Sequence, residues 1–400
     1  MKKLLSRINK KEAVFILVFV VLLGVLSLIP TGFEKQIYFN SEGVKAKVIT
    51  ADNSGVYSTG LIRQGAQNCW VLIESGSHKG EEVLATNLYS GKMEFDKTFE
   101  VGDAAWVLLE RDAENNIIFA NMIDHYRFDL MLVLIGLFAL CLIVFSGFTG
   151  IRTLLSFAFA LLTIWKVLIP SMLRGADPML IALVVGNVIT IATLLLVAGF
   201  TKKALAAIAG AVACSFITGL LAMLWGDIFK VHGAVMQWSE SLLYSGFENL
   251  DLTGIFQAGI YLACSGAILD LAIDISAALD EVSLHNPGVS RKALVKSGLT
   301  IGRSVVGSQT TTLLLAYMGS YISVMMVFMA QGTPMMNIFN SKMIAAEVLH
   351  TFVGCIGLVL VSPLTSAICG IVYKHAPKTA QSAVPVLADM PAPQTDADAL

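Results

Sequence analysis

Apolar residues form eight long runs along the chain, separated by shorter polar stretches. The first run follows the basic start MKKLLSRINKKE with no A-x-A-like cleavage site after it, so residues 1–30 are expected to hold an uncleaved signal-anchor helix. Each later run has roughly the 20 residues that a helix needs to cross a bilayer. These runs lie at residues 129–148, 152–171, 178–200, 204–225, 254–278, 305–330 and 343–372. The pattern predicts an α-helical integral membrane protein with about eight transmembrane helices in a lipid bilayer.

Residues 31–126, between the first and second runs, carry short β-branched segments divided by Gly, Asn and Asp. The stretch WVLLERDAENNIIFANMI indicates a strand, a polar turn at Asp112–Asn116 and a returning strand. We therefore expect a small all-β domain, OB-like or another small barrel. His78 and His125 stand alone in this region, and we expect both to be surface histidines rather than metal ligands.

Positive charge indicates how the helices are oriented, because Lys and Arg collect in short cytoplasmic loops. With the N-terminus inside, fourteen Lys and Arg residues fall on inner segments and four on short outer loops and helix ends. We therefore expect both termini to be cytoplasmic, the β-domain to be extracytoplasmic, and residues 127–375 to form a seven-helix membrane domain. Residues 376–400 are rich in Ala and Pro, which predicts a disordered cytoplasmic tail.

Two connections between the runs are longer than a turn. The outer connection, Asp227–Asp251, is expected to hold an amphipathic helix with Trp238 and Tyr244 at the lipid headgroups. In the inner connection, Ser290 is a candidate N-cap for a short basic helix that precedes the next membrane segment.

Composition agrees with a membrane protein and removes several other classes. Hydrophobic residues make up 56% of the chain and charged residues 14%, well below the roughly 25% charged residues of soluble domains. A net charge of −2 leaves no large phosphate-binding surface, so no nucleic-acid partner is expected. The six cysteines form no CxxC or zinc spacing, and no catalytic or nucleotide-binding motif occurs. We expect no enzyme activity, no cofactor and no bound metal.

The stretch ILDLAIDISAALDEVS places two carboxylates inside an apolar run, at Asp270 and Asp274. Asp270 lies about 24 Å along a helix that starts near Gly254, and Asp274 follows one turn later on nearly the same face. Two like charges so close do not both stay ionised without a counter-ion, so the pair predicts a cation site or a shared proton. The alternative is structural: Asp274 is hydrated near the interface and Asp270 is hydrogen-bonded to a neighbouring hydroxyl. Small residues nearby predict close helix approach on this face.

The next run carries polar groups at the same expected depth. IGRSVVGSQTTTLLLAYMGSYIS contains Ser304, Ser308, Gln309 and Thr310–Thr312 beside Gly302 and Gly307. Its glycines permit a bent helix that lines a cavity, and Arg303 is placed to pair with one aspartate at the cytoplasmic mouth. The alternative is interhelical hydrogen bonding without a ligand.

Glu347 and His350 occur in AAEVLHTFVGCIGLVL, close after an outer loop. His350 is a candidate proton-relay partner or gating partner of the carboxylate. The alternative is a hydrated pair at the membrane interface.

Three segments together carry a resemblance to a family. GAILDLAIDISAALDEV, SGLTIGRSVVGSQTTTLLLAYMGSYI and AAEVLHTFVGCIGLVLVSPLTSAI resemble, in this order, the YibE/F-like family of bacterial multi-spanning membrane proteins. The resemblance covers residues 128–375. It implies a bacterial cytoplasmic-membrane protein with an extracytoplasmic β-domain after a first anchor. It supplies a class and a topology but no substrate.

The chain departs from the family pattern at three positions. It has Ser304 where the pattern implies an acid, Thr311 where it implies an asparagine, and Ala346 where it implies a second glutamate beside Glu347. If those groups coordinate an ion, the departures predict a divergent or inactive branch.

Two functions fit these patterns. The first is a transporter or ion- or proton-coupled exporter, in which Asp270 and Asp274 bind a small cation or proton and Thr310–Thr312 complete the site. The second is a membrane scaffold or regulatory subunit whose β-domain binds an envelope component or partner. Either function allows a second related membrane subunit or a homo-oligomer.

Overall fold

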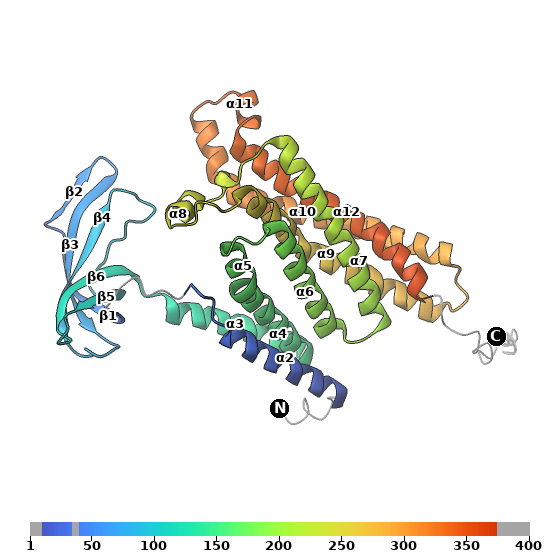
Figure 1. Ribbon diagram of the computed structural model, residues 1–400, viewed down its shortest axis with the longest axis horizontal. Coiled ribbons are helices and arrows are strands. Elements are labelled where there is room, and N and C mark those ends of the chain that lie inside the picture. The colour runs from blue at the N-terminus through green and yellow to red at the C-terminus, as the bar shows by residue number, and fades with distance from the viewer. Residues whose placement is uncertain (1–9, 34–39, 374–400) are drawn as a thin grey trace, which may run out of the picture. The chain divides into compact units, whose positions relative to one another are not determined.

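The computed structural model describes residues 10–33 and 40–373, and the chain divides between Leu155 and Ser156 into two compact units (Figure 1). The first unit holds the helix α2 (Lys10–Leu28), six strands, the helix α3 (Phe128–Ser146) and the start of α4 (Phe148–Thr163). The strands are β1 (Ser41–Asp52), β2 (Val56–Thr59), β3 (Ile62–Ile73), β4 (Glu82–Ser90), β5 (Ala104–Arg111) and β6 (Ile117–His125).

The six strands form one sheet that closes on itself. Its order is β1-β5-β6-β4-β3-β2, and an additional pairing of β1 with β3 closes five strands into a barrel. β4 and β6 pair in parallel, and the other neighbours are antiparallel. When β2 is left out, the order around the barrel is β1-β3-β4-β6-β5. Counted along the chain, these are the first, second, third, fifth and fourth barrel strands, which is the order of an OB-type barrel. The predicted strand–turn–strand at Asp112–Asn116 is present as the β5–β6 hairpin.

Side chains alternate between the inside and the outside of this barrel, as the period of two in a strand requires. Val44, Ala46 and Val48 of β1 point inward and are fully buried or nearly so. They meet inward residues of the other strands and Phe99, which lies between β4 and β5. The barrel therefore has an apolar core of its own.

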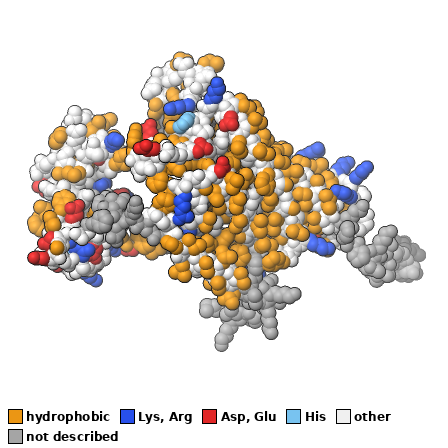
Figure 2. All heavy atoms as spheres, viewed as in Figure 1, with side chains coloured by type: hydrophobic (Ala, Val, Ile, Leu, Met, Phe, Trp, Pro, Cys, Tyr) orange, Lys and Arg blue, Asp and Glu red, His pale blue; other side chains and the backbone are white. Residues whose placement is uncertain are grey.

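The second unit is helical. After α4 it continues with η1 (Ile164–Leu168), α5 (Ile169–Leu173), α6 (Pro178–Ala198), α7 (Lys202–Phe229), η2 (Gly233–Val235), α8 (Ser239–Tyr244), α9 (Leu252–His285), α10 (Arg291–Ala330), α11 (Met335–Phe339) and α12 (Lys342–Val372). α9 packs against α6, α7, α10 and α12, so it is the central helix of this unit. Apolar side chains cover most of the face of the unit seen in Figure 2.

Helices occupy the positions of all eight apolar runs in the described residues. Six of them are long and apolar enough to cross a membrane, and α10 is a seventh if its two inclined parts, Arg291–Gly319 and Tyr321–Ala330, count as one span. The first run gives a shorter apolar helix, Ile16–Leu28. The number of spans and their orientation therefore stay predictions.

Two predicted connections differ from the structure. Ser290 is the N-cap of α10, as expected, because its side chain accepts a hydrogen bond from the Ala293 backbone N–H. The helix that starts there does not end as a short basic helix but continues for 40 residues to Ala330. In the outer connection, the expected amphipathic helix is reduced to the short elements η2 and α8. The predicted cytoplasmic tail lies outside the described residues.

Candidate functional site

The predicted aspartate pair lies on the side of α9 that faces away from the core of the helical unit. One face of α9 is buried through Ile268, Leu271 and Ile275. Asp270 and Asp274 share the exposed face, one turn apart. Neither carboxylate makes a hydrogen bond or ion pair within the described residues. The sequence therefore placed the two acids on one face, but they do not point into the bundle.

Two of the small residues on α9 near the aspartates, Gly259 and Gly266, face open space. A Cβ built on Gly259 or Gly266 meets no atom within 4 Å. The close helix approach predicted for this face is therefore wrong for these two positions.

The level of the aspartates along α9 follows from one hydrogen bond. Ser276 donates to the backbone oxygen of Lys203 at the start of α7, with the oxygens 2.7 Å apart. Asp274 therefore lies near the end of the bundle where α7 begins, and Asp270 lies about 6 Å further toward the middle. By the predicted topology, this is the cytoplasmic end.

The polar groups of α10 bond to their own helix. Thr310, Thr311 and Thr312 each donate to a backbone oxygen one turn earlier, at 2.9–3.1 Å. Ser304 and Ser308 do the same. Such bonds satisfy the hydroxyl protons without a partner on another helix. The aspartates receive no hydrogen bond from these groups.

Arg303 lies near Asp274 in depth but does not pair with it. A Cβ on the adjacent Gly302 would lie 3.6 Å from the δ-carbon of Ile275, which places this turn of α10 beside the turn of α9 that carries Asp274. The Arg303 side chain is exposed and makes no ion pair with a described residue. The two aspartates, three threonines and one arginine of the predicted site therefore form no hydrogen bonds or ion pairs with one another in the described residues.

The two glycines of this segment have different roles. α10 is continuous through Gly302 and Gly307, so the bend predicted there is absent. Gly302 lies against Ser362 of α12, where a side chain has no room, whereas a Cβ on Gly307 meets no atom within 4 Å. Gly302 is thus a helix-contact residue.

Glu347 is buried inside the helical unit, which contradicts the alternative of a hydrated interfacial pair. Only 6% of its surface is exposed, and its Oε1 atom has no hydrogen-bond partner. On the next turn, His350 Nε2 and Thr351 Oγ1 are also buried without a partner. Thr351 differs in this from the threonines of α10, which bond back to their own helix.

α9 and α10 enclose this cluster together with α12. The rings of His350 and Tyr317 stack with centroids 4.5 Å apart and planes at 27°. Tyr317 and Tyr321 of α10 both lie within electrostatic range of the Glu347 carboxylate. A Cβ on Gly354 would lie 3.2 Å from Cβ of Cys264, so α9 and α12 meet closely below the cluster. Sequence reasoning found the Glu–His spacing but not its burial.

The three positions that depart from the family pattern fall in two environments. Ser304 and Thr311 lie on the exposed side of α10. Ala346 is buried among apolar side chains that include Leu349 and Phe256. A carboxylate at position 346 would therefore enter an apolar cluster and not the Glu347 environment.

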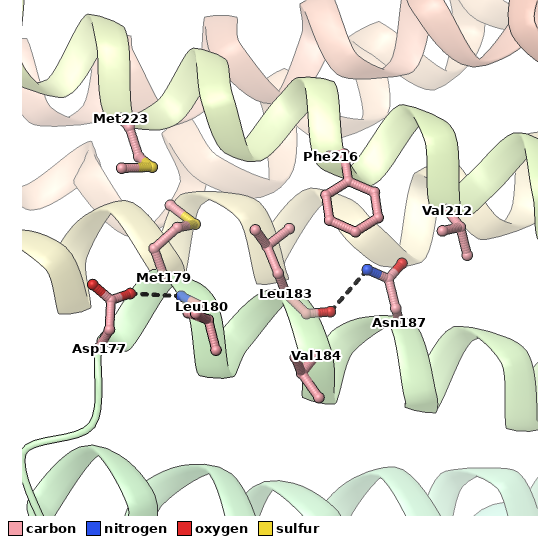
Figure 3. Close-up of a pocket in the computed structure, with 9 residues that line it drawn as sticks. All are labelled: Asp177, Met179, Leu180, Leu183, Val184, Asn187, Val212, Phe216 and Met223. Carbon is pink, nitrogen blue, oxygen red and sulfur yellow. Dashed lines mark hydrogen bonds between the residues drawn. The ribbon is translucent and has the colours of Figure 1, made fainter.

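A pocket of about 490 Å³ between α6 and α7 offers no polar site (Figure 3). Its lining is mostly apolar, and its two polar side chains already have partners. Asp177 accepts from the Leu180 backbone N–H at 2.7 Å, and Asn187 donates to the Leu183 backbone oxygen at 2.8 Å. Asn187 also accepts from Ser215. Such a groove suits a lipid chain better than a polar substrate.

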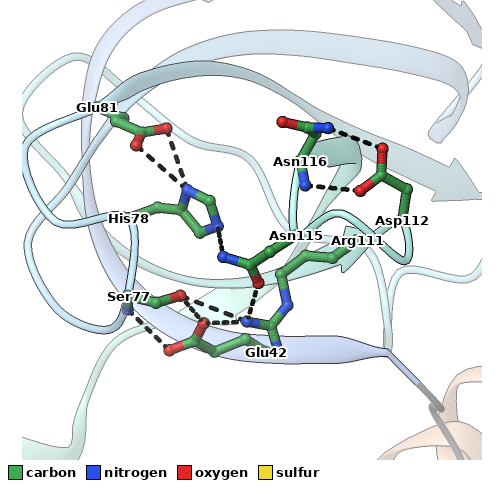
Figure 4. Close-up of polar contacts among 8 residues, drawn as sticks. All are labelled: Glu42, Ser77, His78, Glu81, Arg111, Asp112, Asn115 and Asn116. Atoms are coloured by element: carbon green, nitrogen blue, oxygen red, sulfur yellow. Dashed lines mark hydrogen bonds and ion pairs between the residues drawn. The ribbon is translucent and has the colours of Figure 1, made fainter.

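The barrel carries a connected polar cluster at the β5–β6 hairpin (Figure 4). Arg111 donates to Glu42 at 3.0 Å and to Asn115 at 2.8 Å. His78 lies between Glu81 and Asn115, at 3.2 and 3.4 Å. Hydrogen bonds from Ser77, reinforced by Arg111, hold the pKa of Glu42 below its ordinary value, although partial burial opposes this shift. His78 is only 9% exposed, so the expectation of a surface histidine is wrong there.

His125 is also more enclosed than predicted. Its Nε2 atom lies 3.1 Å from the Thr98 backbone oxygen, and its ring packs on Phe99 with centroids 4.5 Å apart. Among the described residues, no group of three or more His, Cys, Asp or Glu side chains could hold a metal ion.

Residues 134–375, more than half of the chain, match a family model described as YibE/F-like protein. Comparison with curated proteins and with solved structures gives no match to either. The match covers all the helical-unit residues discussed above and does not reach the barrel.

Proposed function

The chain belongs to the YibE/F-like family, and we propose that this membrane protein is a transporter that couples movement of its substrate to a small cation or a proton. The observation that carries the proposal is the pair Asp270 and Asp274, which lies on a helix long and apolar enough to cross a membrane. Neither carboxylate forms an ion pair with a Lys, Arg or His side chain of the described residues. Ionisable residues within such helices mark ion and proton pathways.

The direction of the two carboxylates limits the kind of environment that they can face. A carboxylate facing lipid at the centre of a helix costs about 2.5–3.5 kcal/mol even on lenient scales. The exposed face of α9 must therefore meet water or another subunit at this level. Arg303 and the exposed hydroxyl residues Ser304 and Ser308 lie on α10 at a similar depth. We infer a wet vestibule at the end of the bundle where α7 begins.

In this vestibule the two aspartates act as one ligand. Their side chains are one turn apart, so they share a cation or hold one proton between them more readily than they carry two bare charges. The hydroxyl oxygens of Thr311 and Thr312 retain lone pairs after bonding to their own helix and complete the coordination when an ion is bound. Arg303 competes with the cation for the carboxylates.

Ion-dependent stabilisation of the purified full-length protein tests the proposal. Thermal unfolding is measured with Na⁺, K⁺, Mg²⁺, Mn²⁺ and Ca²⁺ for the wild type and for Asp270→Asn/Asp274→Asn. An ion at 100 times its Kd stabilises the folded state by about 2.7 kcal/mol. One ion should raise the unfolding temperature of the wild type only.

Glu281→Gln is the matched control, because Glu281 is an exposed acid near the end of the same helix. It should respond to the ion as the wild type does. Flux of that ion into proteoliposomes follows. Lack of stabilisation by every ion across pH 5 to 9, together with no flux, would sink the transporter.

A second candidate function rests on the outer surface of the barrel. Trp70 and Leu84 are cross-strand partners on β3 and β4, and both are about half exposed. Phe119 of β6 is exposed as well. β3 and β4 are the second and third strands of the barrel, the face with which OB folds bind ligands. This face supports the scaffold or regulatory role.

Binding to an envelope fraction separates the two candidates. Trp70→Ser should abolish capture of the full-length protein by such a fraction if the barrel is the functional part. Asp270→Asn/Asp274→Asn should leave that capture unchanged.

A further inference from the structure

The cluster Glu347–His350–Thr351 is the strongest unexplained feature of the helical unit. Positions 347, 350 and 351 lie on one side of α12, because residues three and four apart are neighbours on a helix. Each contributes a buried polar atom without a partner: Glu347 Oε1, His350 Nε2 and Thr351 Oγ1. Buried polar groups are nearly always hydrogen-bonded, and an unsatisfied one costs about 1–3 kcal/mol. Three such atoms within one turn indicate a ligand.

The donor set decides which ligand fits. Ca²⁺ takes 6–8 oxygen ligands and Mg²⁺ needs octahedral oxygen coordination. The cluster supplies one carboxylate and one threonine hydroxyl, and no metal-holding group of side chains occurs in the described residues. A soft metal is not favoured either, since Cys264 already donates to the Tyr261 backbone oxygen at 3.1 Å. A proton needs only one acceptor atom, and the cluster supplies two.

The charges around Glu347 also favour a bound proton. Tyr317 and Tyr321 of α10 are the described titratable groups within electrostatic range of Glu347, and Cys264 and Cys355 lie within range of Tyr317. None of these is a cation, and Glu347 makes no ion pair with a described residue. An ionised carboxylate buried without a counter-charge is strongly disfavoured, whereas the neutral acid is tolerated.

We propose that Glu347 and His350 form a proton-binding site in α12, and that the proton is the coupling ion of the transporter. Only the second claim, that the proton is the coupling ion, depends on the proposed transporter function. The acidic O–H bond of Glu347 breaks and an N–H bond forms on His350, which leaves a carboxylate and an imidazolium side by side. The Tyr317 ring covers the imidazole and excludes water from this step.

This site is separate from the aspartate pair. α12 crosses α9 where Gly354 meets Cys264. Glu347 lies seven residues before Gly354, and Asp270 lies six residues after Cys264, on helices that both run toward the end where Tyr373 contacts Ser276. The two carboxylate sites are therefore about 20 Å apart along the bundle. A transporter that exchanges a proton for a second ion needs a binding site for each, and these two sites would supply them.

Infrared difference spectroscopy of the full-length protein in lipid nanodiscs tests the proton site without a transport assay. The carbonyl stretch of a protonated carboxylic acid is recorded in H₂O and D₂O while the pH is raised from 5 to 10. The wild type should show this band at neutral pH, with a deuterium shift, and lose it at high pH. Glu347→Gln should lose the contribution of Glu347 to this band at every pH.

Two further variants make the result specific. Asp270→Asn/Asp274→Asn should keep the band, which assigns it to Glu347 and not to the α9 pair. His350→Gln should keep the band and strengthen it at neutral pH, because the proton can no longer move to the imidazole.

Two outcomes would overturn the proton site: a wild type without the band at neutral pH, or a band of unchanged strength in Glu347→Gln. If Glu347→Gln does not fold, the stronger band in His350→Gln decides, and an unchanged band counts against the proposal. Failure of the proposed function looks different, because the band then behaves as expected while no ion stabilises the protein and no flux is seen.

Discussion

The barrel core and one turn of α12 both bury polar side chains, but they differ in how many of the hydrogen bonds of those side chains are made. Gln67 and Asn87 are fully buried in the barrel. Gln67 donates to Asn53 at 2.9 Å and to the Phe99 backbone oxygen at 2.8 Å, and it accepts from Asn87 at 3.0 Å and from the Phe99 N–H at 3.1 Å. All the hydrogen-bonding capacity of this amide is in use.

In α12, by contrast, Glu347, His350 and Thr351 each have a buried polar atom without a hydrogen-bond partner. A fully satisfied polar network fixes one arrangement of a core, whereas a half-satisfied one lowers stability. The difference indicates that polar groups in the barrel hold the structure together and that those in α12 are kept for a ligand. Substitutions in the two regions should therefore have opposite patterns of effect.

The largest expected effect is in the barrel core. Gln67→Leu removes four hydrogen bonds and leaves the Phe99 backbone N–H and oxygen buried without partners, while the Asn87 amide keeps only its bond to the Lys97 backbone oxygen. We expect a loss of about 3 kcal/mol in the local unfolding free energy, since each unsatisfied group costs about 1–3 kcal/mol. Native-state hydrogen exchange of barrel amides in the full-length protein measures it.

Gln64→Leu is the matched control, because Gln64 lies on the same strand and is exposed. Its exchange rates should stay close to those of the wild type. Equal effects of the two substitutions would contradict a structural role for the buried amide.

The second effect compares two glycines of one helix. Gly302→Ala places a methyl group against Ser362, and such overpacking costs about 1–3 kcal/mol. Gly307→Ala meets open space and should stabilise the helix by up to about 1 kcal/mol, because Ala is the better helix former. Unfolding in a sodium dodecyl sulfate titration, followed by circular dichroism, measures both.

Opposite signs for the two variants would support the contact role of Gly302. A loss of stability in both would mean that α10 needs both glycines for another reason, such as bending in a second conformation.

The sequence predicted those parts of the fold that depend on local patterns. Apolar runs located the helices, short β-branched segments divided by Gly, Asn and Asp indicated the β-domain, and the capping preference of serine placed the start of α10 at Ser290. The burial of Glu347 could not be predicted in this way, because it depends on how α12 packs against other helices such as α9 and α10. The direction of Asp270 could not be predicted for a similar reason: it is set by which residues of α9, such as Leu271 and Ile275, pack on neighbouring helices. Local sequence also cannot distinguish Gly302 from Gly307.

A smaller effect is expected from the charged cluster of the barrel. The pKa of Glu42 is held below its ordinary value mainly by a hydrogen bond from Ser77. This contribution is present at pH values above the ordinary pKa of a glutamate and is lost as the pH falls through the lowered folded-state pKa. Ser77→Ala should cost about 1 kcal/mol at neutral pH and much less in acid.

Hydrogen exchange of the β5–β6 hairpin amides, corrected for the intrinsic effect of pH, measures this difference. Ser54→Ala is a control, since Ser54 bonds to Asp52 outside this cluster. An effect of Ser77→Ala that is independent of pH would show that the hydroxyl stabilises the loop without acting through Glu42.

The smallest effect on stability should come from the residues that matter most to the proposed function. Asp270 and Asp274 are exposed on α9 and bond to no described residue, so Asp270→Asn/Asp274→Asn in ion-free buffer should change the unfolding free energy by less than about 0.5 kcal/mol. A small gain is the expected sign, because the substitution removes repulsion between two carboxylates one turn apart. Detergent unfolding of the full-length protein measures it beside Gln67→Leu, which should lie at the other end of the scale. A loss of about 2 kcal/mol or more would mean that the aspartate pair stabilises the helical unit, as Gln67 is expected to stabilise the barrel. The contrast between the two regions would then fail at the residues on which the proposed transporter depends.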